Sequence, residues 1–415
     1  MAKGTNKVVI ATDPDREGEA IAAHIASEVD NEKISRVQFT EITKEGVDEG
    51  MNNPRQIDKD LVEAQTARRI IDRLIGYKIS PVLWSTLKKN MKFVSVNLSA
   101  GRVQSAALKI MIERERLRQA FNSATYYDII ASFKSGNTEF NALLSKIDNK
   151  RIAVGKDFDP NTGKLNNEDV ILLSESQAST LIKELDNGNW TVTNVEEKIV
   201  NSNPKPPFTT STLQQEAARK LRSSAKKTMR DAQQLYEKGF ITYMRTDSTS
   251  LSEEGINGAR NLILKKYGNE YLPSTSKRYS TKVKNAQEAH EAIRPAGINF
   301  ATREKVQQSL DNDTARLYDL ILKRTLASQM KSAKIKRVSV SIKNGKTLFK
   351  ANGKVILFPG YMAAYVESSD KRNPSHDDQE TILPPLKQGE LLNCERLLPN
   401  EHQTKPPARF TLSLI

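Results

Sequence analysis

The alternation of hydrophobic and polar residues predicts a short strand, a helical region and then further strands in the first half of the chain. Residues 7–12 form an apolar run typical of a buried strand. From about residue 58 to residue 120, apolar side chains recur with the period of an amphipathic helix, and glycines are few. Strand-like patterns follow at residues 126–133 and 169–173, separated by a polar loop at residues 146–167.

The second half of the chain shows the same change of pattern. A proline-rich boundary at residues 201–207 precedes a mainly helical region that extends to about residue 330. Alternating residues return at 335–342 and 347–358, before a polar loop at residues 367–381. This order of strands, helices and strands predicts a helical domain inserted into an all-β domain. The sequence contains no internal repeat.

Composition and charge add a class of partner to this picture. The chain has 64 lysines and arginines against 50 acidic residues, a net charge of +14 that favours a polyanion such as DNA or RNA. At 415 residues, several domains are expected. A single cysteine, Cys394, excludes an intramolecular disulfide and a cysteine-rich zinc site. No apolar run of about 18 residues and no signal-peptide pattern is present, so we expect a cytoplasmic protein without a membrane partner.

Four carboxylates lie within seven positions directly after the first predicted strand: Asp13, Asp15, Glu17 and Glu19. Close like charges raise one another's pKa unless a cation lies among them, and Asp13, Asp15 and Glu17 offer the oxygen ligands that Mg²⁺ prefers. The spacing favours a metal site at the end of a strand. The alternative is structural: Asp13 could cap a helix that starts near Pro14, with Glu17 and Glu19 favouring its positive end.

A tyrosine followed two positions later by an arginine is the second candidate for chemistry. Tyr243 lies in the segment Gly-Phe-Ile-Thr-Tyr-Met-Arg-Thr-Asp-Ser at residues 239–248. A phenol is a weak nucleophile near neutral pH, so its attack on a phosphate requires positioning and neutralisation of the phosphate charge. Arg245 can supply that neutralisation through two hydrogen bonds to phosphate oxygens. The alternative is a strand at residues 240–244 in which Tyr243 only packs.

The two motifs together resemble the type IA DNA topoisomerases, in which an Asp-x-Asp-x-Glu centre of the Toprim kind serves a tyrosine nucleophile on another domain. The resemblance continues in further segments, at residues 65–77, 80–84, 99–105, 207–215 and 286–295. The motifs Tyr-Met-Arg-Thr-Asp-Ser and His-Glu-Ala-Ile-Arg-Pro are similar to those of the bacterial topoisomerase I branch. The topoisomerase III branch typically has proline after the tyrosine.

The resemblance implies a multidomain fold that combines α/β, α and β parts in a toroidal core. The implied domains are a partial Toprim α/β domain, a helical DNA-binding domain, a hinged β-arch domain, an inserted helical domain with the tyrosine, and the truncated start of the remaining core. Their expected bounds are residues 1–58, 59–121, 122–202 with 331–405, 203–330, and 406–415. Opening of the hinge would separate Tyr243 from the carboxylates.

The resemblance also implies a mechanism. Tyr243 would attack a phosphodiester of single-stranded DNA, form a 5′-phosphotyrosine and release a 3′ hydroxyl that later reseals the break. Strand passage would relax negative supercoils with Mg²⁺ as cofactor and without ATP, in agreement with the absence of a Walker-type loop. Arg245 would stabilise the phosphate, while Glu237 and His290 would transfer protons or orient it. Asp247 would hold Arg245 or cap the next segment. The alternatives are a surface carboxylate for Glu237 and a helix histidine for His290.

Contacts to DNA are implied for motif residues and favoured for two clusters of positive charge. The motif residues are Arg68, Arg69, Asp72, Tyr77, Trp84, Ser99, Ala100, Gly101, Arg102, Val103, Gln104 and Arg245. The first cluster is Arg219, Lys220, Arg222, Lys226, Lys227 and Arg230, and the second is Lys88, Lys89 and Lys92. Trp84 could stack on an unpaired base or belong to a core. A solvated helix face is the alternative for the charges.

The chain departs from the family pattern at both ends. A Val-Glu-Ser-Pro-Ala-Lys-like motif before residue 1 and a Gly-Ile-Gly-Arg-Pro-Ser-Thr-Tyr-like motif after residue 415 are expected for the family and are not in this sequence, nor are the zinc ribbons of many members. We therefore expect an incomplete core, with either poor stability or dependence on a separate fragment as partner.

Three functions from different classes follow. The first is a magnesium-dependent topoisomerase associated with the nucleoid, and the second is a catalytically inactive or split fragment that only binds single-stranded DNA. A Toprim nuclease or primase ranks last, because it leaves Tyr243, Arg102 and His290 without a role.

Overall fold

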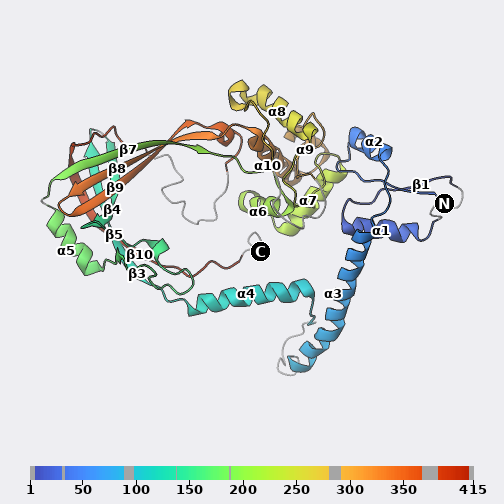
Figure 1. Ribbon diagram of the computed structural model, residues 1–415, viewed down its shortest axis with the longest axis horizontal. Helices are drawn as coiled ribbons and strands as arrows, with labels where there is room; N and C mark the ends of the chain where they lie inside the picture. Colours follow the sequence, from blue (N-terminus) through green and yellow to red (C-terminus); the bar gives the residue numbers. More distant parts are fainter. Residues whose placement is uncertain are drawn as a thin grey trace.

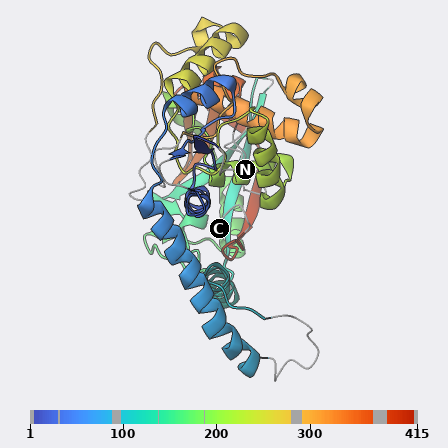
Figure 2. The same cartoon turned by 90° about the vertical axis from the view of Figure 1, so that its right-hand side faces the viewer.

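The computed structural model describes residues 5–29, 33–87, 98–136, 138–186, 188–279, 291–366 and 382–410. Its elements follow one another around a ring (Figure 1), and the view turned by 90° shows one long helix, drawn in blue, projecting below the rest (Figure 2). The first elements of the chain lie beside a helical part formed much later in the sequence, and a β-sheet occupies the opposite side of the ring.

The amino-terminal part is a small α/β unit. Its elements are β1 (Val8–Ile10), α1 (Arg16–Ala26), β2 (Ile34–Arg36) and α2 (Lys44–Asn52). The strands pair in parallel, and Ile10 packs with Ala22 and Ala26 of α1. The predicted strand at residues 7–12 is confirmed over its three central residues. The predicted helix starts two residues after Pro14 and is capped by Asp15, whose Oδ1 accepts the Gly18 N–H at 2.8 Å, so the prediction of an Asp13 cap is wrong.

Two long helices follow, α3 (Lys59–Thr86) and α4 (Arg102–Ala120). They confirm the helical pattern predicted for residues 58–120 over these two ranges, whereas residues 98–101, which are described, are not helical. Asp58 caps α3 by accepting the N–H groups of Asp60 and Leu61, and Pro81 lies inside the helix. Only Ser80 of α3 and no residue of α4 is buried. These helices therefore present almost their whole surface to solvent within the described residues.

The β-sheet contains eight strands in the order β3-β10-β7-β8-β9-β4-β5-β6, and β3 also pairs with β4, so the strands from β3 round to β4 close on themselves. The strands are β3 (Thr125–Ser135), β4 (Thr138–Ile147), β5 (Lys150–Ile152), β6 (Val170–Ile171), β7 (Trp190–Ser202), β8 (Ala333–Asn344), β9 (Thr347–Phe358) and β10 (Leu391–Gln403). A 3₁₀ turn (η3, Gly155–Asp157) and α5 (Glu175–Leu185) lie between β5 and β7. Phe133, Trp190 and Phe349 form the aromatic centre of its core.

A helical part is inserted between β7 and β8, which are antiparallel neighbours that pair from Thr191↔Lys343 to Ser202↔Ala333. It holds α6 (Thr210–Leu221), α7 (Ala225–Glu237), α8 (Glu253–Tyr267), α9 (Arg303–Ser309), α10 (Asn312–Gln329) and the 3₁₀ turn η4 (Asn269–Tyr271). The helix α10 is its buried centre, and β9 returns to it through η5 (Gly360–Ala363). The arrangement is consistent with the helical insertion expected from the sequence pattern. It carries the tyrosine segment to the amino-terminal unit (Figure 1).

Candidate active site

The turn between β1 and α1 is held by a buried ion pair. Arg36 Nε donates to Glu19 Oε2 at 3.0 Å, and both side chains are fully buried. The same guanidinium donates to the backbone oxygens of Thr12 at 2.9 Å and Asp13 at 3.0 Å. Gly18 is required here because a Cβ at its position would lie 2.1 Å from the Asp13 carbonyl oxygen. Glu19, read from the sequence as a helix-end charge, instead helps to fix the turn that carries Asp13 and Asp15.

The tyrosine segment, residues 239–246, is bound on two sides by backbone hydrogen bonds. Tyr243 N–H donates to the Thr40 oxygen at 2.8 Å, and Thr242 N–H donates to the Arg294 oxygen at 2.9 Å. Gly239 has φ +70°, and a Cβ there would lie 2.3 Å from the Ile42 oxygen. The segment is not a strand: its only ladder contact in the described residues is the single bridge between Ile241 and Pro295. The strand predicted as the alternative at residues 240–244 is therefore wrong, although Tyr243 is 2% exposed.

The Tyr243 hydroxyl meets the carboxylate turn directly. It donates to Asp15 Oδ2 at 2.7 Å, and Arg245 Nη1 donates to the same oxygen at 3.2 Å. The Tyr236 ring packs edge-on against the Tyr243 ring, with centroids 5.2 Å apart. Burial, and next the hydrogen bond and charge of Asp15, raise the pKa of Tyr243 above its usual value. The phenol is therefore protonated at neutral pH, with a carboxylate in place to accept its proton.

Asp13 lies half-buried beside this contact. Its pKa is raised, first by burial and then by the negative charge of Asp15, with a smaller contribution from Glu237. Arg245 and Arg36 lower it in part. Glu237 is exposed at the end of α7 and accepts a hydrogen bond from Gln233 at 2.8 Å. The structure thus brings Asp13, Asp15, Tyr243 and Arg245 together, with Glu237 close enough to act on Asp13 electrostatically.

Glu17 is paired with a residue of another helix. Its Oε1 accepts a hydrogen bond from Arg68 of α3 at 3.1 Å, and both side chains are a little under half exposed. Among the residues that the structure describes, no group of three histidine, cysteine or acidic side chains is placed to hold a metal. Asp13 and Asp15 fit magnesium by their chemistry, since a cation would offset the mutual repulsion that raises the Asp13 pKa. Glu17, paired with Arg68, does not join them in this arrangement.

Two further residues of the predicted mechanism lie elsewhere or outside the described part. Asp247 is exposed, and the Arg245 guanidinium is paired with Asp15 in the position where the sequence suggested Asp247 as its partner. His290 lies outside the described residues, as do Lys88, Lys89 and Lys92.

The residues predicted to contact DNA follow α3 and the start of α4. Arg102 Nε donates to Asp72 Oδ1 at 2.9 Å, which lowers the pKa of Asp72, and the Arg73 guanidinium lies 5.5 Å from the centre of the Tyr77 ring. Trp84 Nε1 donates to the Leu98 oxygen at 2.6 Å, while its ring stays 51% exposed. The remaining predicted contacts that lie at the surface are Arg69, Ser99, Val103 and Gln104, with Ala100 and Gly101 half-buried between them.

Only the amino-terminal part of α3 lies near the tyrosine site within the described residues. The first turns of α3 lie beside α1, where Arg68 meets Glu17, and α3 then leads away from the site (Figure 1). Trp84 was also considered as a core residue, and its exposure contradicts that alternative.

The basic cluster before the tyrosine is divided between internal pairs and free surface. Arg219 binds Glu216 at 3.1 Å, Lys227 binds Asp231 at 2.6 Å, and the Lys220 ammonium lies 3.6 Å from the centre of the Tyr365 ring. Arg222, Lys226 and Arg230 are exposed, with Arg230 3.3 Å from Asp231. Half of the cluster therefore supports the fold.

Sequence reasoning missed the residues that join the tyrosine segment to the amino-terminal unit. Thr40 and Glu41 come from the loop after β2, and Arg294 belongs to the Ala-Ile-Arg-Pro segment. Arg294 was within a recognised motif, but nothing in its spacing indicated Glu41 as its partner. No helix in the described ranges is long and apolar enough to cross a membrane.

Two protein-family profiles match this chain, one over its amino-terminal unit and one over the rest. The DNA topoisomerase family profile matches residues 56–415, and a Toprim domain profile matches residues 1–42. DNA topoisomerase 1 of Synechocystis sp. is 48% identical over 411 residues, which cover 99% of this chain and 45% of that protein. DNA topoisomerase 1 of Mycolicibacterium smegmatis is 46% identical over 426 residues, again 99% of this chain and 45% of that protein.

A solved structure is similar as well. The full-length topoisomerase I from Thermotoga maritima has a TM-score of 0.77 and 35% sequence identity, and the match covers 99% of this chain and 63% of that one. The chain spans about 45% of the length of the curated relatives named above. By its profile match and its relatives, the chain belongs to the type IA DNA topoisomerase family, in the bacterial topoisomerase I branch.

Proposed function

We propose that this chain provides the strand-cleaving centre of a type IA topoisomerase, in which Tyr243 attacks one strand of DNA and becomes linked to its 5′ phosphate. The observation that carries the proposal is the pair of contacts on one carboxylate oxygen: the Tyr243 hydroxyl at 2.7 Å and Arg245 at 3.2 Å from Asp15 Oδ2. A nucleophile, a proton acceptor and a cation for the phosphate thus lie within one hydrogen-bonded group.

The proton of Tyr243 decides how cleavage begins. Because the pKa of the buried phenol is raised, the free phenolate is scarce at neutral pH and the proton must leave as the new bond forms. Asp15 accepts that proton, the Tyr243 oxygen bonds to phosphorus, and the 3′ oxygen of the neighbouring nucleotide leaves and takes up a proton. Resealing reverses these bond changes. One ester replaces another, so no ATP is consumed.

Arg245 turns from Asp15 to the phosphate in this scheme. It is about half-exposed, so its guanidinium can leave the carboxylate without moving the backbone. Its charge offsets the phosphate oxygens during attack. Glu237 and His290 are proposed to assist proton transfer at the 3′ oxygen, and Asp247 to support Arg245 once it has left Asp15.

Magnesium is the proposed cofactor, held by Asp13 and Asp15, with Glu17 as a third ligand after it leaves Arg68. When bound, it supplies positive charge to the phosphate oxygens and the 3′ oxygen. Asp13 would be ionised in that state, since the cation favours its charged form.

The strand itself is proposed to lie along α3 and the start of α4. Arg68, Arg69, Arg102 and Gln104 offer donors to phosphate and bases, while the exposed rings of Tyr77 and Trp84 can stack on unpaired bases. Arg222, Lys226 and Arg230 add exposed positive charge to the segment that precedes the tyrosine in the chain. Relaxation of negatively supercoiled DNA, which exposes single strands, is the proposed net activity.

The second candidate is a chain that binds single-stranded DNA without cleaving it. One observation favours it: α4 has no buried residue in the described part, so its surface is open to a strand without any cleavage chemistry. A labelled single-stranded oligonucleotide separates the candidates.

The test is a covalent adduct that survives denaturation, measured with the purified chain and magnesium. The parent chain is expected to form the adduct and Tyr243→Phe to form none, while both bind the oligonucleotide with the steep salt dependence of several phosphate contacts. Tyr279→Phe is the matched control, because it removes another phenol of the helical part, one that is half-buried and donates to the Ser328 oxygen at 2.9 Å. An adduct with Tyr243→Phe contradicts the proposal, and binding without any adduct from the parent favours the second candidate.

A further inference from the structure

The amino-terminal unit and the tyrosine segment meet along a narrow seam. We define the seam as the contacts of residues 39–42 with residues 236–243 and 294–297. Three backbone atoms of the loop are used: the Phe39 oxygen accepts the Tyr236 hydroxyl at 2.9 Å, the Thr40 oxygen accepts Tyr243 N–H at 2.8 Å, and the Ile42 oxygen faces Gly239. The proposed strand passage requires Tyr243 to move away from Asp15. The seam must therefore open during strand passage.

Glu41 is the one side chain of that loop that makes a buried ion pair across the seam. Its carboxylate lies 3.0 Å from Arg294 Nη1, and the two side chains are 6% and 2% exposed. Both carboxylate oxygens also accept the Gly297 N–H, at 3.1 and 3.0 Å. Charge-assisted hydrogen bonds in a buried setting are the strong ones, so Glu41 contributes more to closure than the single backbone contacts beside it.

Arg294 connects this ion pair to the nucleophile. Its backbone oxygen accepts Thr242 N–H at 2.9 Å, one residue before Tyr243, while Thr40, one residue before Glu41, accepts Tyr243 N–H. The tyrosine segment is therefore hydrogen-bonded to two backbone segments, one at Thr40 and one at Arg294. The Glu41–Arg294 ion pair connects these two segments. Movement of one segment relative to the other would move the Tyr243 hydroxyl relative to Asp15.

Arg294 and Glu41 each make a further contact on their own side of the seam. Arg294 is bound by both oxygens of Glu291, at 2.6 and 2.9 Å, and its Nη2 donates to Ser252 Oγ at 3.1 Å. Glu41 Oε1 accepts the Thr43 hydroxyl at 2.8 Å. Separation of a buried pair is costly mainly because it leaves a charge uncompensated. Here Arg294 keeps the charge of Glu291, and Glu41 keeps the hydrogen bond from the Thr43 hydroxyl, so opening of the pair costs less than isolation of two buried charges.

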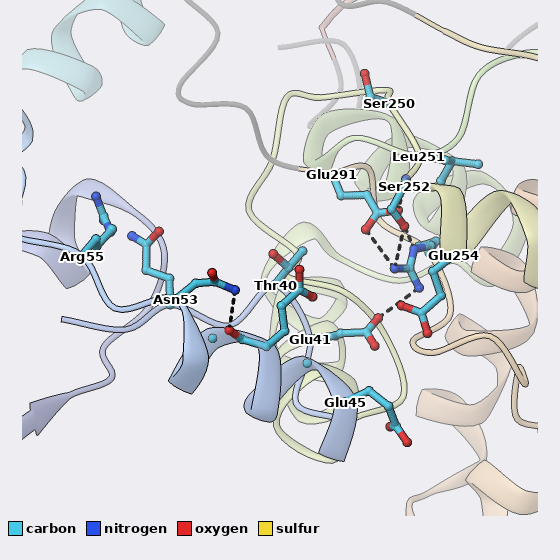
Figure 3. Close-up of a pocket in the computed structure, with 15 residues that line it drawn as sticks. Thr40, Glu41, Glu45, Asn53, Arg55, Ser250, Leu251, Ser252, Glu254 and Glu291 are labelled. Atoms are coloured by element: carbon cyan, nitrogen blue, oxygen red, sulfur yellow. Dashed lines mark hydrogen bonds and ion pairs between the residues drawn. The ribbon is translucent and has the colours of Figure 1, made fainter. Parts of the chain in front are cut away.

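The surroundings favour release in a second way. Glu41 and Glu291 reach the same guanidinium from opposite sides, with Glu254 close by (Figure 3). Burial, and next the charge of Glu41, raise the pKa of Glu254, which is a sign of repulsion between the two sides of the seam. A cavity of about 650 Å³ lies at this place, and its lining includes Glu41 from one side of the seam and Arg294 from the other.

We propose that Glu41 and Arg294 are positioning residues that form a releasable latch, which holds Tyr243 against Asp15 when closed and must break for the seam to open. The proposal deepens the proposed function, on which its role in strand passage rests. The latch itself is a property of the free chain. It can therefore be tested without DNA, magnesium or cleavage.

The test is hydrogen exchange at single backbone amides. Tyr243 and Gly297 donate across the seam, whereas Thr242 donates to Arg294 within the tyrosine-bearing part. With Glu41→Gln, exchange at Tyr243 and Gly297 is expected to rise about tenfold or more while Thr242 stays protected, a tenfold change being ~1.4 kcal/mol. Unchanged exchange at Tyr243, or an equal rise at Thr242, overturns the latch.

Two variants in the same cavity complete the design. Glu45→Gln removes an exposed carboxylate of α2 and is expected to leave all three amides as in the parent. Glu254→Gln removes repulsion against Glu41 and is expected to slow exchange at Tyr243 and Gly297, and this arm remains decisive if Glu41→Gln does not fold. Faster exchange at Tyr243 with Glu254→Gln, or an effect of Glu45→Gln as large as that of Glu41→Gln, contradicts the proposal. Failure of the adduct assay with this exchange pattern intact would reject cleavage and keep the latch.

Discussion

The helix α10 and the pair α3 and α4 carry similar apolar residues and bury them to opposite extents. Most of the 18 residues of α10 are buried, and it forms the centre of the core that holds the tyrosine segment. In the 28 residues of α3 only Ser80 is buried, and in the 19 residues of α4 none is. Leu74, Trp84 and Leu108 are all more than half exposed.

The difference separates a helix that is stabilised by packing from helices that are stabilised mainly by a cap and by surface ion pairs. A helix in a protein is stabilised mostly by burial of its apolar face. Within the described residues, α3 and α4 rest on a cap at Asp58 and on exposed pairs such as Asp72–Arg102 and Glu115–Arg409. Exposed ion pairs contribute about 0–1 kcal/mol each. Apolar surface of this extent is typical of a binding region, in agreement with the proposed path of the DNA strand.

The largest expected effect comes from truncating one apolar side chain in each region. Ile321→Ala in α10 removes a fully buried side chain and is expected to lower the free energy of unfolding by about 2–5 kcal/mol. Leu108→Ala in α4, where the side chain is 57% exposed, is expected to change it by less than about 0.5 kcal/mol. Urea unfolding followed by circular dichroism measures both. Similar losses would mean that Leu108 is covered in solution.

A smaller effect on stability distinguishes an aspartate–arginine ion pair with a buried carboxylate from one that is exposed. Asp157 accepts two hydrogen bonds from Arg151, at 2.7 and 2.6 Å, and these bonds lower its pKa from 3.8 to about 2. A lowered pKa means that the carboxylate stabilises the fold above about pH 4 and that this contribution is lost as the pH falls toward 2. Asp157→Asn is therefore expected to cost about 1–3 kcal/mol at pH 7 and nothing below pH 2.

Asp72 provides the comparison for that prediction. Arg102 lowers its pKa as well, but the pair is exposed, so Asp72→Asn is expected to cost much less stability at pH 7 than Asp157→Asn does. Stability measured against pH for the parent and both variants tests the difference. A loss for Asp72→Asn as large as that for Asp157→Asn would contradict it.

Local pattern predicted the fold where one face of an element is buried. The strand β9 has the predicted bounds, Thr347–Phe358, and β3 and β8 extend beyond their predicted ranges by one or two residues at each end. The strands β4, β7 and β10 were missed. In β7 and β10 most residues are exposed or half-buried along much of their length, so little apolar alternation marks them. Within the predicted loop at residues 146–167, β5 is held mainly by its partners β4 and β6.

Candidate chemistry was predictable within a motif and not between motifs. Asp15 was recognised by its spacing, and Tyr243 and Arg245 by theirs, yet their shared hydrogen-bonded oxygen depends on contacts 228 and 230 residues apart in the chain. The pairing of Glu17 with Arg68 likewise depends on a contact with another helix, 51 residues away in the chain. Glu41 had no local signal because its role depends on burial against Arg294.

The smallest expected effect uses the two tryptophans, one in each kind of environment. Trp190 is 4% exposed and packs edge-on against Phe133 and Phe349, whereas Trp84 on α3 is 51% exposed. If the exposed helices bind the strand, a single-stranded oligonucleotide should quench Trp84 and leave Trp190 unchanged. Trp84→Phe should remove the quenching and weaken binding only a few-fold, since phenylalanine still stacks on a base. Trp190→Phe should keep the quenching. Quenching that persists in Trp84→Phe would place the strand away from α3 and leave its exposed apolar surface for a different partner.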